Sequence, residues 1–257
     1  EDAAADLDGK SMRGDRIRVE LAHTPREKER ARKDGRGGGG GGGSRGFGGG
    51  GTRKNELGFH GDMRPNPRVE QDLFGETESP TPGINFDKYD NIPVEVSAGC
   101  PEPYTEFTVE TIGVNLLKNV VLSKYTKPTP VQKYAIPIGL AGGDMMACAQ
   151  TGSGKTAGFL FPTIAVLLRD GPAPESENRR SRCAYVSCLI LSPTRELTVQ
   201  IFEEAQKFCY CTGLRPVVVY GGALIQQQQR ELDQGADILV ATPGRLVDLI
   251  ERGRVSL

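Results

Sequence analysis

The pattern of apolar and polar residues changes near residue 104. From there to the end, short apolar runs alternate with longer segments in which apolar residues recur every three or four positions. Short runs are typical of buried strands, and the longer spacing is typical of amphipathic helices. Strands are predicted at residues 145–148, 188–191, 217–220 and 237–241, and helices at 109–119, 131–140, 157–168, 193–208, 224–234 and 246–252.

Strands that alternate with helices at this spacing predict an α/β fold with a parallel sheet covered on both faces. In such a sheet, ligands bind at the edge formed by the carboxyl ends of the strands. A glycine-rich or polar segment follows each of the four predicted strands. We therefore expect all four segments at that edge, namely residues 149–156, 193–197, 221–222 and 242–245.

The segment after the first predicted strand reads Ala149-Gln150-Thr151-Gly152-Ser153-Gly154-Lys155-Thr156. A strand before it and a helix after it make this the context of a phosphate-binding P-loop. Its glycines let consecutive N–H groups converge on phosphate oxygens at a helix N-terminus. Lys155 is expected to reach the β- and γ-phosphates of a nucleotide, and Thr156 to hold Mg²⁺, so these two residues are the catalytic candidates. A Gly/Ser/Thr turn that happens to precede a lysine is the alternative.

The first hundred residues have a different composition. Many of the 34 glycines form runs at 37–43 and 48–51, next to a segment dense in Arg and Lys at 26–36. Such a segment cannot bury enough apolar area to offset its conformational entropy, so residues 24–103 are predicted to be a disordered Gly/Arg/Pro-rich linker. The Arg/Gly tract either contacts RNA loosely or is a spacer. Leu73 and Phe74 are isolated apolar residues that could dock onto the folded part or onto a partner.

Charge and cysteine content narrow the class of protein. The formal net charge of −1 argues against a uniformly basic nucleic-acid binder and leaves local basic patches open. None of the six cysteines stands in a C-x-x-C pair, and several lie in apolar runs, so we interpret them as reduced core residues of an intracellular protein. No apolar run reaches the length of a membrane span, so no membrane partner is expected.

From about residue 85 to 257 the chain resembles the DEAD-box RNA helicases, and among them the cytoplasmic, translation-linked subfamily. Residues 125–132, Tyr-Thr-Lys-Pro-Thr-Pro-Val-Gln, match the family's Q motif, with Phe107 as the upstream aromatic residue. The resemblance implies that Gln132 hydrogen-bonds the adenine edge, which suits the paired donor and acceptor of an amide, and that Tyr125 stacks on the ring. The implied ATP-binding residues are Tyr125, Lys127, Thr129, Gln132, Ala149, Gln150, Thr151, Gly152, Ser153, Gly154, Lys155 and Thr156.

The other segments match further motifs of the same family. The resemblance implies that they hold the RNA backbone through Pro193, Thr194, Arg195, Gly221, Gly222, Thr242, Pro243, Gly244 and Arg245. Helix N-termini and arginines are suited to phosphates. The implied organisation is a Q motif region at 104–133 followed by a partial RecA-like P-loop domain at 134–257.

The activity implied by the resemblance is ATP-dependent RNA unwinding or remodelling of ribonucleoprotein, with ATP and Mg²⁺ as cofactors and RNA as partner. Translation-initiation or ribonucleoprotein proteins are further partners that it leaves open. A cytoplasmic location is expected, and a nuclear one is left open. The alternatives are a catalytically silent RNA-binding or adaptor protein and a DNA-directed P-loop enzyme.

The family's Asp-Glu-Ala-Asp tetrad, its Ser-Ala-Thr motif and its second RecA-like domain are not found in these 257 residues. We therefore expect this chain by itself not to turn over ATP, because a carboxylate is needed to hold the metal. We also expect it to be marginally stable, because the absence of the strand that carries the tetrad leaves apolar surface uncovered.

The first 23 residues carry a weaker signal. An Ala-rich helical pattern at 3–7 precedes a strand-like alternation at 16–21. Residues 1–23 thus resemble the last helix and final strand of an RNA-recognition motif, without the aromatic strands that stack bases. A partial tail of such a domain is one interpretation, and a solvated segment of mixed charge is the other.

Overall fold

The computed structural model describes residues 54–75, 93–172 and 182–257, and the backbone of residues 17–21. The helix predicted at 3–7 and the Arg/Gly tract at 24–53 lie outside these residues. The chain forms two compact units, so the predicted domain at 134–257 is divided between them. The first unit comprises residues 1–22, 65–170 and 203–210, and the second unit comprises residues 23–64, 171–202 and 211–257.

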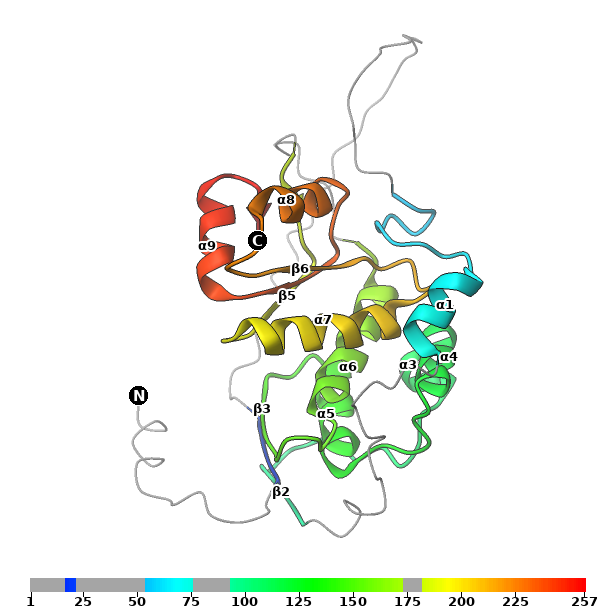
Figure 1. Ribbon diagram of the computed structural model, residues 1–257. Coiled ribbons are helices and arrows are strands. Elements are labelled where there is room, and N and C mark those ends of the chain that lie inside the picture. Colours follow the sequence, from blue (N-terminus) through cyan, green and yellow to red (C-terminus); the bar gives the residue numbers. More distant parts are fainter. Residues whose placement is uncertain (1–16, 22–53, 76–92, 173–181) are drawn as a thin grey trace, which may run out of the picture. The chain divides into compact units, whose positions relative to one another are not determined.

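Helices dominate the first unit (Figure 1). They are α1 (Pro67–Phe74), α3 (Val109–Ile112), α4 (Val114–Leu122), α5 (Pro130–Leu140), α6 (Lys155–Asp170) and the end of α7 (Arg195–Cys209). The helix predicted at 109–119 is in fact two helices, because Gly113 has a φ of 83° and interrupts the helical hydrogen bonding. Helices α5 and α6 pack side by side, and their buried residues include Ile136 and Leu160.

The strand before the P-loop lies in a small sheet of the first unit. This strand, β3 (Met145–Cys148), pairs antiparallel with β1 (Ile17–Leu21), which pairs parallel with β2 (Val94–Val96). The strand predicted at 16–21 is therefore present, but it joins the P-loop strand instead of ending a separate tail. The prediction that β3 belongs to the same parallel sheet as the other strands is wrong for the described residues. Hydrophobic spacing predicts that a strand exists, whereas its partner depends on which backbone groups meet in space.

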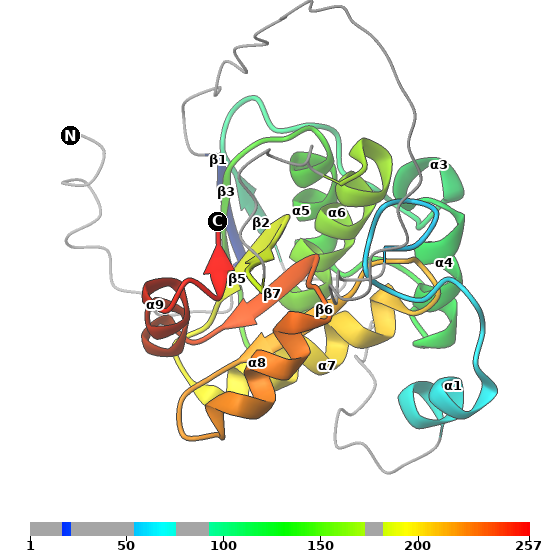
Figure 2. The same cartoon turned by 90° about the horizontal axis from the view of Figure 1, so that it is seen from above.

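The second unit contains the predicted parallel sheet (Figure 2). Strand β7 (Ile238–Ala241) lies between β5 (Cys188–Leu191) and β6 (Pro216–Val219), and it is parallel to both. All four residues of β7 are buried, as expected of a central strand that reads Ile-Leu-Val-Ala. A second parallel pair, β4 (Ala184–Tyr185) and β8 (Val255–Ser256), was not predicted because two residues give no measurable period.

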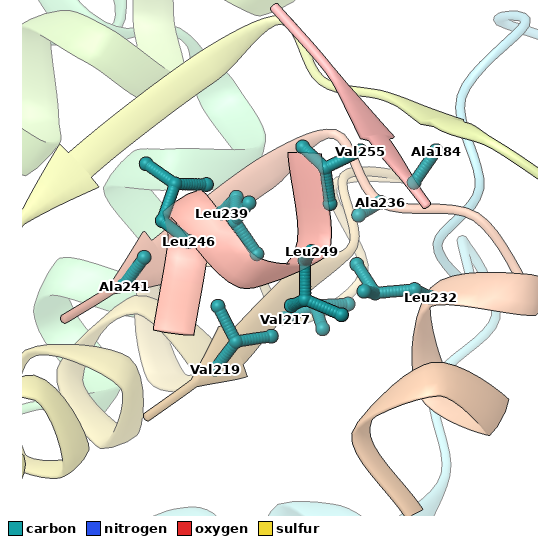
Figure 3. Packing of buried hydrophobic residues seen from close by; sticks show 10 residues of the cluster. All are labelled: Ala184, Val217, Val219, Leu232, Ala236, Leu239, Ala241, Leu246, Leu249 and Val255. Atoms are coloured by element: carbon teal, nitrogen blue, oxygen red, sulfur yellow. The ribbon is translucent and has the colours of Figure 1, made fainter. Parts of the chain in front are cut away.

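Two helices cover one face of this sheet. Leu232 of α8 (Ile225–Asp233) and Leu246 and Leu249 of α9 (Pro243–Glu251) belong to the same buried cluster as residues of β6 and β7. Figure 3 shows the ten side chains of this cluster: Ala184, Val217, Val219, Leu232, Ala236, Leu239, Ala241, Leu246, Leu249 and Val255. Helix α9 begins at Pro243, three residues before the predicted start, so the Pro-Gly-Arg segment is its first turn.

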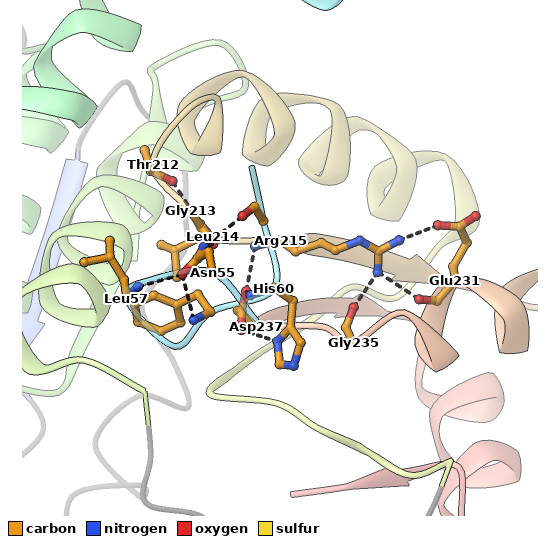
Figure 4. A network of polar contacts seen from close by, with 12 residues as sticks. Asn55, Leu57, His60, Thr212, Gly213, Leu214, Arg215, Glu231, Gly235 and Asp237 are labelled. Atoms are coloured by element: carbon orange, nitrogen blue, oxygen red, sulfur yellow. Dashed lines mark hydrogen bonds and ion pairs between the residues drawn. The ribbon is translucent and has the colours of Figure 1, made fainter. Parts of the chain in front are cut away.

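The prediction of disorder for residues 24–103 is wrong for residues 54–75. Residues 54–64 form a strap that packs within the second unit (Figure 4). Asn55 donates through its side-chain nitrogen to the carbonyl oxygens of Gly61 and Gly213, both at 2.8 Å. The Nδ1 atom of His60 lies 2.7 Å from a carboxylate oxygen of Asp237, whose other oxygen accepts from the backbone N–H of His60 and of Arg215.

The ring of Phe59, at the centre of the strap, is 1% exposed. Helix α1 is tied to the first unit in a similar way, since Phe74 contacts the ring of Tyr210 at a centroid distance of 5.8 Å. The predicted docking of Phe74 is thereby confirmed. Composition predicted disorder because these segments are mostly polar, but a few polar side chains with specific partners are enough to order them. No helix in the described part of the chain is long and apolar enough to cross a membrane.

Candidate functional site

The P-loop of the first unit joins β3 to α6 by a turn that requires glycine. Gly152 and Gly154 have φ values of 82° and 86°, in the left-handed region that other residues rarely adopt. A side chain at Gly154 would also collide with the amide nitrogen of Gln132. Helix α6 then begins at Lys155 and runs for 16 residues. The loop thus brings free N–H groups and the N-terminus of a long helix to one place, as a phosphate-binding loop does.

Lys155 lies against the backbone of its own loop. Its Nζ atom donates to the carbonyl oxygens of Ala149 and Gln150, the second at 2.7 Å. Burial lowers the pKa of Lys155, and the nearby Cys148 acts in the opposite direction with a smaller effect. A partly desolvated ammonium with only neutral acceptors gains from an anion at this position. Phosphate oxygens are therefore better partners for Lys155 than the two carbonyls it now contacts.

The segment predicted to be a Q motif lies directly on the P-loop. The Thr129 hydroxyl donates to the carbonyl oxygen of Ser153 at 2.8 Å, and the Gln132 side-chain nitrogen donates to that of Gly154 at 3.0 Å. The side-chain oxygen of Gln132 accepts from the backbone N–H of Thr129 at 3.0 Å, which caps α5. The structure thus brings together two predicted sites that lie more than twenty residues apart.

This arrangement bears on the predicted roles of the individual residues. Gln132 is 0% exposed, and each end of its amide already has a protein partner, although one N–H and one lone pair are still available. Its contact with adenine stays a prediction. The Ser153 hydroxyl is buried and has no hydrogen-bond partner among the residues that the structure describes, so a ligand oxygen would satisfy it. Thr156 is half-buried in the first turn of α6, and its contact with Mg²⁺ stays a prediction.

Tyr125 belongs to a cluster of aromatic rings. Its ring contacts those of Phe107, Phe161 and Phe208 edge to face, at centroid distances of 6.5, 5.8 and 5.9 Å. Burial raises the pKa of the Tyr125 hydroxyl, and the charge of Glu204 adds to this effect. The structure therefore gives Tyr125 a packing role next to α6, and its stacking on adenine stays a prediction. Lys127, in the same motif, is half-buried.

The second unit joins the three segments predicted to bind RNA. Arg195, at the start of α7, lies over the ring of Tyr220 at 4.8 Å from its centroid. Gly221 and Gly222 follow at once, and Gly222 has a φ of 80°. Arg245, in the first turn of α9, donates to the side-chain oxygen of Gln228 at 2.8 Å and to the carbonyl oxygen of Ala223 at 3.2 Å.

The remaining members of these segments lie at helix starts. Thr194 caps the first turn of α7, because its hydroxyl accepts from the N–H of Leu197 at 3.3 Å. Thr242 precedes α9, and its N–H donates to the carbonyl oxygen of Val219 at 3.0 Å. Pro193, Pro243 and Gly244 are exposed. Two helix N-termini, a glycine turn and two arginines are thus available to phosphates within one unit.

Two residues that join these segments were not predicted from the sequence. Tyr220 presents its ring to Arg195, and Gln228 bonds both the carbonyl oxygen of Tyr220, at 3.0 Å, and Arg245. Gln228 stands in a run of four glutamines, a pattern that suggests a solvated helix and gives no sign of a buried role. Its spacing was the available signal, since Ile225, three residues before it, and Leu232, four residues after it, place it on the apolar face of α8.

Comparisons with known proteins agree with these features. Residues 129–257, half of the chain, match the family model "DEAD/DEAH box helicase". The RNA helicase Prp28 from Chaetomium thermophilum, solved with ADP, is similar with 39% identity and a TM-score of 0.50, over 61% of this chain and 36% of its own. The yeast DEAD-box splicing factor Prp28 is similar with 29% identity and a TM-score of 0.52, over 62% and 38%.

The chain therefore spans little more than a third of the length of either solved structure. The matched region contains the Q motif from Thr129 onward, the P-loop and all three segments of the second unit. Since the family model covers half of the chain, this chain belongs to the DEAD/DEAH box helicase family.

Proposed function

We propose that this chain is the nucleotide-binding and RNA-binding part of an ATP-dependent RNA helicase, which couples ATP hydrolysis to RNA unwinding or to remodelling of ribonucleoprotein. The observation that carries the proposal is the pair of hydrogen bonds from Thr129 and Gln132 to the carbonyl oxygens of Ser153 and Gly154. They attach the element proposed to select adenine to the loop proposed to hold phosphates. A nucleotide that fills one of these elements then affects the geometry of the other.

Each group of the P-loop has a proposed task. Lys155 exchanges its two carbonyl partners for the β- and γ-phosphates. The Ser153 hydroxyl and the N–H groups at the start of α6 donate to further phosphate oxygens. Thr156 is the proposed Mg²⁺ ligand from this chain. The nucleotide supplies the phosphoryl group whose transfer to water releases free energy. Similarity to the Chaetomium helicase, solved with ADP, supports the choice of an adenine nucleotide.

RNA is the proposed partner of the second unit. Arg195 and Arg245 provide positive charge, and the turn at Gly221 and Gly222 lets a phosphate approach the backbone. Contacts of this kind bind any sequence and weaken with salt. A cytoplasmic location and contacts with translation-initiation or ribonucleoprotein proteins are further parts of the proposal that rest on the family resemblance alone.

Calorimetry with ADP and GDP tests the nucleotide assignment. Adenine presents an amino donor at position 6, where guanine presents a carbonyl acceptor, and Gln132 is proposed to contact this edge. We expect ADP to bind about tenfold more tightly than GDP, a difference of about 1.4 kcal/mol. Gln132→Ala should remove most of this preference, whereas Lys133→Ala, a neighbouring change on the same helix, should keep it. Thermal unfolding of both variants checks that they remain folded.

The same experiments decide between the proposal and its alternatives. Equal affinities of the unsubstituted chain for ADP and GDP would contradict the adenine assignment. RNA binding without binding of either nucleotide would favour the catalytically silent adaptor. The expected absence of ATP turnover by this chain is measured with radiolabelled ATP in the presence of RNA, and hydrolysis that is lost in Lys155→Ala would contradict it.

A further inference from the structure

Gln228 is the buried member of a glutamine run on α8. Gln226 and Gln227 are exposed and Gln229 is half-buried, whereas Gln228 is 6% exposed. Burial of an amide is unfavourable unless both of its ends are hydrogen-bonded. Both ends of Gln228 are satisfied, by the carbonyl oxygen of Tyr220 at 3.0 Å and by the guanidinium of Arg245 at 2.8 Å. Gln228 is thus bonded to one of the segments proposed to bind RNA, through Arg245, and to Tyr220, the residue just before another.

The two partners of Gln228 lie in different elements, at the end of β6 and at the start of α9. Tyr220 is the last residue before the glycine turn, so its carbonyl oxygen helps to fix the direction in which that turn leaves β6. Arg245 stands in the first turn of α9, and its second bond, to Ala223, ends just after the glycine turn. The turn is therefore bracketed by two residues, Tyr220 and Ala223, that are connected through Gln228 and Arg245.

The chemistry of this position is selective. The side chain must donate to a carbonyl oxygen and accept from a guanidinium, so a single neutral group has to be both donor and acceptor. Glutamate offers no donor and would repel phosphate, and lysine or arginine offers no acceptor. The bond from Arg245 is charge-assisted, and it restricts a side chain that otherwise has considerable rotamer freedom.

We propose that Gln228 is a positioning residue for RNA binding, which holds Arg245 and the turn at Gly221 and Gly222 as one pre-organised phosphate-binding surface. Arg195 extends this surface to the third segment, because its guanidinium lies over the ring of Tyr220. A pre-organised arginine loses less conformational entropy when it binds than a free one. The inference rests on the proposed function, since it assumes that these segments contact RNA.

The glutamine run supplies a matched control for the test. The affinity of the full chain for a fluorescein-labelled single-stranded oligouridine is measured by anisotropy at several salt concentrations. Gln228→Ala should weaken binding about tenfold and lower the slope of log affinity against log salt by about one phosphate contact. Gln227→Ala makes the same change one residue away on the exposed side, and it should alter affinity by less than about twofold. ADP affinity should be unchanged in both variants.

A double-mutant cycle separates positioning from a general effect on folding. If Gln228 acts through Arg245, then Gln228→Ala should have little further effect on RNA affinity once Arg245→Ala is present. Additive effects of the two changes would overturn the proposal. Gln228→Met provides a second variant in case the alanine variant unfolds, because methionine fills similar space in a helix without polar ends. It should weaken RNA binding as Gln228→Ala does.

Two results overturn the inference in different ways. If the unsubstituted chain binds no RNA at any salt concentration, the proposed RNA-binding function of these segments fails and the inference fails with it. If the unsubstituted chain binds RNA and Gln228→Ala, Gln228→Met and Gln227→Ala all bind as tightly, only the role of Gln228 is wrong. A loss in Gln228→Met that equals the loss in Gln228→Ala, with normal thermal unfolding, supports positioning.

Discussion

In each unit a buried glutamine side chain holds the motif segments, but the groups that it bonds differ between the two units. In the first unit, the amide of Gln132 links the carbonyl oxygen of Gly154 to the backbone N–H of Thr129. In the second unit, the amide of Gln228 links the carbonyl oxygen of Tyr220 to the side chain of Arg245. In both units the amide nitrogen of the glutamine donates to a carbonyl oxygen in the segment that follows a strand. The amide oxygen differs, because it accepts from the backbone in the first unit and from an arginine side chain in the second.

This difference separates a site shaped mainly by the backbone from a site that depends mainly on side chains. The P-loop is shaped by its backbone, since Gly152 and Gly154 adopt left-handed conformations and Lys155 is held by carbonyls of the same loop. The surface of the second unit depends on side chains, since Arg195 and Arg245 are held by Tyr220 and Gln228. We therefore expect backbone changes to affect the first unit most and loss of side-chain partners to affect the second.

The largest effect is expected from the strap, because the second unit also relies on residues far away in sequence. His60 and Asp237 are 177 residues apart, and Phe59 beside His60 is 1% exposed. Phe59→Ala should lower the free energy of unfolding by about 3–5 kcal/mol through the cavity it leaves. Urea unfolding measures this change, and hydrogen exchange should become faster in β6 and β7.

Leu57→Ala is the control for the strap, because Leu57 is 44% exposed on the same segment. It should change the free energy of unfolding by less than about 0.5 kcal/mol. Should Phe59→Ala unfold at the same urea concentration as the unsubstituted chain, the strap would not stabilise the second unit.

A smaller effect on stability is expected when glycines of the two turns are replaced by alanine. These changes test whether the P-loop depends on its backbone more than the turn of the second unit does. Gly154→Ala introduces backbone strain of about 1–3 kcal/mol, and its methyl group would also meet the amide of Gln132. We expect loss of ADP binding together with a lower melting temperature. Gly221→Ala places a methyl group in open space at a residue without positive φ, so it should leave the melting temperature unchanged.

Differential scanning fluorimetry and ADP titration of the two glycine variants measure these outcomes side by side. Equal losses of melting temperature in Gly154→Ala and Gly221→Ala would show that the two turns impose the same backbone demands. That result would contradict the distinction drawn between the two units.

The smallest effect concerns protons taken up when nucleotide binds. Burial lowers the pKa of Lys155, so part of this side chain is neutral in the free protein at alkaline pH. Phosphate favours the charged form and raises the pKa again, so binding takes up protons just below the ordinary lysine pKa of about 10.4. Fewer protons should be taken up by this group at pH 7, because that pH is farther below the ordinary lysine pKa.

Calorimetry of ADP binding at pH 7 and pH 9, in pairs of buffers with different ionisation enthalpies, counts these protons. Lys118→Met removes an exposed lysine of the same unit and should leave the difference between the two pH values intact. The same proton count at both pH values would mean that Lys155 does not change its environment when nucleotide binds.

Much of the local structure could be predicted from the sequence. Spacing of apolar residues placed β5, β6 and β7 and predicted that they are parallel, and the glycines of the P-loop indicated the turn that the structure contains. These features depend on residues close together in the chain, whose preferences are expressed locally. Family resemblance added the motif residues of both units, whose roles stay predictions, and the comparison with the family model confirmed the family itself.

Other features were decided only by the tertiary structure. The pairing of β3 with β1, the docking of His60 on Asp237 and the link from Gln228 to Arg245 each join residues whose sequence gives no mark of the partner. The sequence does not show whether the hydrogen-bonding groups of a polar residue are bonded to water or to other groups of the protein. Its hydrogen-bond partner is chosen only when folding excludes water, because burial then makes an unsatisfied donor or acceptor costly.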